Sequence, residues 1–98
     1  MNISDLQVKV RDDWNQNSKL KPTSEQKLLF VIEELGEVAE AIRKQTKSVD
    51  YKTDDGKMGS EFADLLISIV TLANEYEIDL ETELEGFWQK LSARRSAH

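Results

Sequence analysis

The chain has 98 residues, of which 39% are hydrophobic and 33% are charged, and its formal net charge is −6. This length predicts a single domain covering residues 1–98, and a chain so short buries only about two thirds of its unfolded surface, which favours a partner subunit. The acidic balance argues against a basic face for nucleic acid, and no apolar run reaches the roughly 20 residues of a membrane span. We therefore predict a cytoplasmic protein with neither nucleic acid nor membrane as a partner.

Two residue types needed for common catalytic chemistry are nearly missing. The chain contains no Cys, and its single His is the last residue, His98. This excludes disulfides, zinc–thiolate sites, and Ser–His or Cys–His catalysis. It also removes the Glu-x-x-His ligand pairs of di-iron bundles.

Helical spacing of apolar residues begins at the N-terminus. Residues 3–17 carry Ile3, Leu6, Val10 and Trp14 at intervals of three and four, which predicts an amphipathic helix. Residues 19–22 then read as a connection. Thr23 and Gln26 form a capping-box pattern that predicts the start of a second helix, which continues to about Lys44.

The second half of the chain predicts two further helices. Residues 45–59 are polar, carry the turn signal Asp54-Asp55-Gly56 and read as a loop. A third helix is expected from about Ser60 to Tyr76, and a fourth from a cap at Asp79 to about Arg94. The fold class is therefore all-α, either an up-and-down four-helix bundle or half of a larger bundle that a second copy completes.

Acidic residues share faces with apolar residues on two of these helices. On the second helix, Glu34 and Glu37 fall on one stripe with Phe30 and Ala41. The third helix is apolar almost all round, which is typical of a buried helix, and its one polar stripe comprises Glu61, Asp64, Ser68, Thr71 and Glu75. Residues 32–41 and 59–88 contain no Lys or Arg that could offset these charges.

The spacing of these acids suits a metal ion. Residues three apart on a helix have Cβ atoms about 5–6 Å apart, so Glu34 with Glu37, and Glu61 with Asp64, form two pairs of neighbouring carboxylates. Two such pairs on facing helices could hold Mg²⁺, which prefers oxygen ligands and keeps positions for water and phosphate. A solvated acidic face and a buried acid cluster with raised pKa remain as alternatives.

The two acidic motifs together resemble a known family. Glu33-Glu34-Leu35-Gly36-Glu37, followed by Glu61-Phe62-Ala63-Asp64, resembles the Glu-Glu-x-x-Glu and Glu-x-x-Asp signature of MazG-like pyrophosphohydrolases. The similarity extends over roughly residues 14–90. It implies a four-helix MazG-like domain, completed as a homodimer or homotetramer, that hydrolyses nucleoside triphosphates to monophosphate and pyrophosphate with Mg²⁺, or Mn²⁺ as a substitute.

The resemblance also implies roles for individual residues. It makes Glu34, Glu37, Glu61 and Asp64 metal ligands, and Glu33 a candidate to orient or deprotonate the attacking water.

The residues expected to contact the substrate match the family's pattern less completely than the acidic motifs do. Trp14 reads either as a core residue or as an aromatic that stacks on the base, as in similar proteins. Lys90, Arg94 and Arg95 match the basic residues near the family's C-terminal end, but the Asn expected between them is replaced within Leu91-Ser92-Ala93.

Three functions follow as hypotheses. The first is nucleoside triphosphate hydrolysis, with water attacking the α-phosphorus, in the removal of non-standard or surplus nucleotides. The second is another branch of the superfamily, acting on phosphoribosyl-ATP or dUTP. The third is an inactive helical oligomerisation or regulatory module. The preferred base and sugar, the choice between dimer and tetramer, and the number of metal ions are not determined by these residues.

Overall fold

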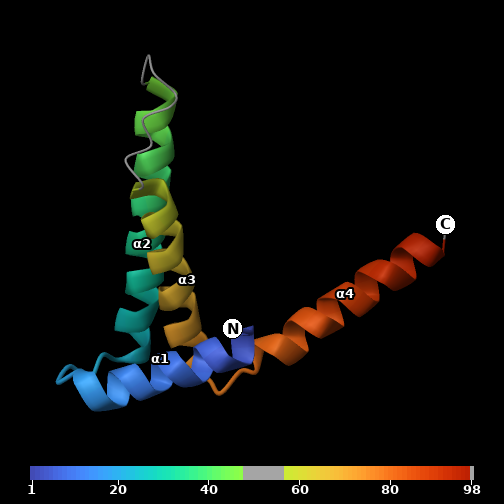
Figure 1. Ribbon diagram of the computed structural model, residues 1–98, viewed down its shortest axis with the longest axis horizontal. Coiled ribbons are helices and arrows are strands. Elements are labelled where there is room, and N and C mark those ends of the chain that lie inside the picture. Colours follow the sequence, from blue (N-terminus) through green and yellow to red (C-terminus); the bar gives the residue numbers. More distant parts are fainter. Residues whose placement is uncertain (48–56, 98) are drawn as a thin grey trace.

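The computed structural model describes residues 1–47 and 57–97, which contain four α-helices and no strand. The helices are α1 (Ile3–Asn17), α2 (Ser24–Lys47), α3 (Lys57–Glu75) and α4 (Leu80–Ser96). Figure 1 shows α2 and α3 side by side and antiparallel, α1 across one end of this pair, and α4 extending away from it. None of the described helices combines the length and the apolar character that crossing a membrane requires. The all-α fold class is confirmed.

The predicted caps are present where side chains can satisfy the first amide groups. The Gln26 amide donates to Thr23 Oγ1 (3.1 Å) and the Thr23 amide to Gln26 Oε1 (2.8 Å), which completes the capping box of α2. Asp79 Oδ1 accepts from the Glu81 amide at the start of α4. These contacts explain why the two helices begin where the sequence predicts.

Two helix ends differ from the prediction by three residues, and the other predicted ends agree to within two residues. α2 continues to Lys47 and α3 begins at Lys57, so each takes residues that were expected in the loop. Inside these turns, Thr46 Oγ1 donates to the Arg43 carbonyl and Ser60 Oγ to the Lys57 carbonyl. A polar stretch without apolar periodicity therefore did not exclude helix at these two ends. The turn expected at residues 54–56 lies outside the described residues.

The hydrophobic core of the described chain is small and lies where α1 and α2 pack on α3. Its buried apolar members are Val10, Val38, Val70 and Ala73, of which Val70 is fully inaccessible to solvent. The buried Gln7 side chain connects α1 to the junction before α4: it donates to Asn74 and to the Ile78 carbonyl, and it accepts from the Leu80 amide. This network holds the start of α4 against α1.

Large apolar side chains remain exposed on all four helices. α3 was expected to be buried almost all round, yet Phe62, Leu66 and Ile69 are 40–51% exposed. The reason is geometric, because α1 and α2 cover only part of its circumference. α4 contacts the rest of the chain mainly through α1 and contains no buried residue. The chain is correspondingly extended, with a radius of gyration of 16.9 Å where about 12.6 Å is typical of a compact domain of this length.

Candidate metal centre

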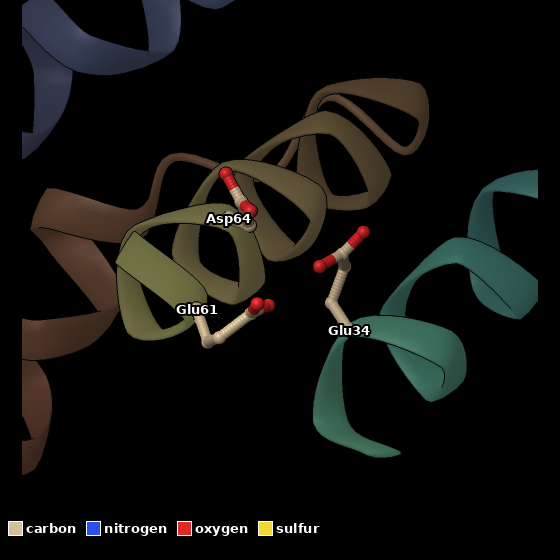
Figure 2. Close-up of side chains that lie close together, drawn as sticks. All are labelled: Glu34, Glu61 and Asp64. Carbon is tan, nitrogen blue, oxygen red and sulfur yellow. The ribbon is translucent and has the colours of Figure 1, made fainter. Parts of the chain in front are cut away.

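Three of the predicted ligands converge between α2 and α3. Figure 2 shows Glu34 reaching from α2 toward Glu61 and Asp64, which lie one turn apart on α3. One carboxylate oxygen from each residue lies within 4.8 Å of the other two. We call Glu34, Glu61 and Asp64 the acidic cluster.

The electrostatics of the acidic cluster are repulsive. The pKa of Glu34 is raised above its ordinary value, first by partial burial and then by the charges of Asp64, Glu61, Glu37 and Glu33. No basic group contributes to this shift. A cation held among these oxygens would relieve both the desolvation and the repulsion.

The donor set fits a hard divalent cation. The acidic cluster supplies carboxylate oxygens and no nitrogen or sulfur, the ligand type typical of Mg²⁺, Mn²⁺ and Ca²⁺. Carboxylates from two helices would leave positions on such an ion for water or for phosphate oxygens. A metal ion held by the acidic cluster would therefore allow an anionic ligand to bind at this acidic surface.

The other two acidic candidates lie beside the cluster. Glu37 is exposed one turn further along α2, outside the group within 4.8 Å, although its charge contributes to the raised pKa of Glu34. Glu33 precedes Glu34 and is also exposed. The structure thus gathers three of the four predicted ligands and leaves Glu37 at the edge.

A cleft of about 390 Å³ opens next to the acidic cluster. We call it the aromatic cleft, and it is lined by Trp14, Phe30, Glu34, Asp64, Ile67, Ser68 and Thr71. The Trp14 indole N–H donates to Thr71 Oγ1 (3.2 Å), whose hydroxyl in turn donates to the Ile67 carbonyl. Trp14 is therefore half-buried and held in place, with part of its surface in the cleft. A larger groove of about 740 Å³ follows α1 but contains none of the acidic cluster.

Sequence reasoning assigned no functional role to four residues of the aromatic cleft, Phe30, Ile67, Ser68 and Thr71. Phe30 shares a stripe of α2 with Glu34, and Ser68 and Thr71 share a stripe of α3 with Asp64. Their helical spacing from the acids was the available signal. Only the packing of α1 across α3 shows that these stripes enclose a cleft together with Trp14.

The predicted basic contacts lie elsewhere. Lys90 and Arg94 are exposed on α4, whose C-terminal end points away from α2 and α3 (Figure 1). A single chain does not bring them to the acidic cluster.

Comparison with known proteins identifies the family. Residues 22–98 match the model of the MazG nucleotide pyrophosphohydrolase domain. The chain belongs to the MazG family. Among solved structures, it is similar to two crystal structures of iMazG from Vibrio DAT 722, Ntag-iMazG and Ctag-iMazG. No curated protein matches the chain.

The likeness to the Vibrio iMazG structures covers nearly the whole of both chains. The first is 31% identical with a TM-score of 0.67, over 94% of this chain and 97% of that one. The second is 33% identical with a TM-score of 0.66, over 92% and 99%. MazG membership makes this a nucleotide pyrophosphohydrolase domain of a family that generally uses a divalent metal, and the acidic cluster is its candidate metal centre.

Proposed function

We propose that this MazG-family chain is a Mg²⁺-dependent enzyme that hydrolyses nucleoside triphosphates to monophosphates and pyrophosphate. The observation that carries the proposal is the acidic cluster beside the aromatic cleft, with Glu34 and Asp64 lining both. One end of this site suits a cation with phosphates, and the other suits a flat aromatic ring. A nucleoside triphosphate likewise carries its phosphates at one end and its flat base at the other.

Glu34, Glu61 and Asp64 would hold the metal, with Glu37 completing the set from the edge of the cluster. When bound, Mg²⁺ supplies charge neutralisation for the triphosphate and lowers the pKa of bound water. Glu33 is the proposed residue that orients the attacking water and accepts its proton. The water oxygen bonds to the α-phosphorus as the bond to the bridging oxygen breaks, and pyrophosphate leaves with the electron pair.

The aromatic cleft would receive the base. Trp14 would stack on it, and Phe30 adds a second aromatic side chain to the lining. Thr71 positions Trp14 through the indole hydrogen bond, and Ser68 contributes a buried hydroxyl, which already donates to the Leu65 carbonyl. Lys90 and Arg94 would contact phosphate oxygens. We place the activity in the clearance of non-standard or surplus nucleotides, in a homodimer or homotetramer.

The decisive experiment measures pyrophosphate release from a panel of canonical and modified ribo- and deoxyribonucleoside triphosphates, with and without Mg²⁺. Glu37→Ala and Asp64→Asn should abolish the release, whereas Glu85→Gln, an exposed change on α4, should retain it. Trp14→Ala should raise KM more than it lowers kcat, because stacking acts mainly on binding. No release from any nucleotide by the folded wild-type protein would favour an inactive oligomerisation module.

A further inference from the structure

A second pocket adjoins the aromatic cleft. It has a volume of about 250 Å³, and we call it the polar pocket. Trp14 and Thr71 line both hollows, so the two are direct neighbours. The other side chains that line the polar pocket are all polar or charged, and they include Arg11, Asn15, Lys27 and Glu75. The hydrolysis proposed above assigns no role to this pocket.

The order of side chains along α2 and α3 places the polar pocket beyond the aromatic cleft. On α3, residues three or four apart form one stripe that runs from the acidic cluster through the cleft to the pocket: Asp64, Ser68, Thr71 and Glu75. The antiparallel α2 (Figure 1) follows the same order with three residues: Glu34, Phe30 and Lys27. At 1.5 Å per residue, Thr71 lies about 10.5 Å and Glu75 about 16.5 Å along the axis from Asp64. A nucleotide that is anchored at the acidic cluster and stacked on Trp14 therefore points the edge of its base into the polar pocket.

The polar groups that α2 and α3 contribute to this pocket are already engaged within the chain. The Glu75 carboxylate accepts hydrogen bonds from Ser24 Oγ and from Lys27 Nζ, both at 2.6 Å. Asn74, which also lines the pocket, accepts from the Gln7 side chain and donates to the Gln7 carbonyl, both at 3.0 Å. These bonds hold the wall of the pocket in place and leave the recognition of a ligand to α1.

Arg11 and Asn15 are the polar side chains that α1 contributes to the pocket. Both are exposed, and neither side chain makes a hydrogen bond or an ion pair within residues 1–47 and 57–97. Arg11 precedes Trp14 by three residues, so the two side chains are neighbours on one face of α1. A guanidinium group carries five N–H donors in a planar fork and no acceptor. The polar pocket therefore offers an unused pair of donors to whatever edge of a base enters it.

We propose that the polar pocket reads the edge of the base, with Arg11 as its specificity-determining residue, and that it selects 6-oxopurine nucleotides. An oxo group beside a ring nitrogen, such as O6 and N7 of guanine or hypoxanthine, accepts both hydrogen bonds of an arginine fork. Adenine presents an amino group in place of O6, so donor meets donor and one of the two bonds is lost. This inference deepens the proposed hydrolase function and rests on it for the placement of the phosphates.

Matched substrates test the selection during turnover. Inosine and adenosine triphosphates differ at position 6 of the base, and we expect kcat/KM of the wild-type protein to be roughly tenfold or more higher for the inosine nucleotide. Arg11→Met removes the donors but keeps a long side chain, and it should bring this ratio close to one. The control Lys9→Met removes a positive charge from a different face of α1 and should keep the ratio. A wild-type ratio near one, or an equal loss of the ratio in both variants, would overturn the proposal.

Binding tests the same selection without any turnover. The chain contains two tryptophans, so in a Trp88→Phe background the fluorescence reports on Trp14 alone. Titration with inosine and adenosine monophosphates in Mg²⁺ should give a Kd roughly tenfold or more lower for the inosine nucleotide, and Arg11→Met should remove the difference. Equal Kd values for the two nucleotides would refute the role of Arg11. If wild type releases no pyrophosphate from any nucleotide but still binds the inosine nucleotide more tightly through Arg11, only the hydrolase proposal fails.

Discussion

Replacing Glu34 with glutamine removes one negative charge from the acidic cluster while keeping the size of the side chain. One of its carboxylate oxygens lies within 4.8 Å of a carboxylate oxygen of Glu61 and of Asp64. At that distance and the dielectric constant of water, each repulsion costs about 0.9 kcal/mol. Glu34→Gln should therefore raise the free energy of unfolding by roughly 1–2 kcal/mol at low salt without Mg²⁺. Each kcal/mol corresponds to a rise in Tm of about 4–8 °C for a domain of this size.

Adding Mg²⁺ should reverse the order of stability. The wild-type protein gains about 2.7 kcal/mol when free Mg²⁺ is a hundred times its Kd, and the variant, lacking one ligand, gains much less. Thermal unfolding at one fixed protein concentration, in EDTA and across a Mg²⁺ titration, measures both effects.

The neighbouring variant Glu33→Gln is the matched control, because its charge affects the pKa of Glu34 least among the four acids that raise it. The difference in EDTA should also shrink at 1 M salt, where the Debye length is about 3 Å. A Glu34→Gln protein that is less stable than wild type in EDTA would refute the repulsive cluster and, with it, the electrostatic argument for a metal.

Two further predictions concern the framework around the site. Gln7→Leu leaves the Ile78 carbonyl and the Leu80 amide without their side-chain partner, so urea unfolding should show a loss of about 2–4 kcal/mol; an unchanged midpoint would contradict the role of Gln7 at the start of α4. The pKa of Glu75 is lowered by hydrogen bonds from Lys27 and Ser24 and by the charge of Lys27. The ionised Glu75 carboxylate therefore stabilises the fold fully at pH values above its ordinary pKa of 4.5. This stabilisation is lost as the pH falls through the lowered pKa. Glu75→Gln should therefore lower Tm at pH 7 and match wild type at the acid end of the series, and a pH-independent difference would be inconsistent with this ion pair.

Local sequence patterns were enough to predict the four helices and to single out the acids. Apolar spacing gave α1 its bounds, and the side chains of Thr23 and Asp79 marked the starts of α2 and α4, because capping is a contact between near neighbours. The pairing of Glu61 with Asp64 followed from helix geometry in the same way. These features depend on residues three or four positions apart, which the sequence displays directly.

What those helices enclose, and what they leave open, depends on how they pack against one another. The crossing of α1 over α3 brings Trp14 to Thr71, 57 residues away, and creates the aromatic cleft. The Gln7 network sends α4 away from α2 and α3, so a chain that reads as a four-helix bundle is open along one side. Helical periodicity shows which face of a helix is apolar, but the partner of that face is set by contacts between residues far apart in the chain, and such contacts leave no period in the sequence.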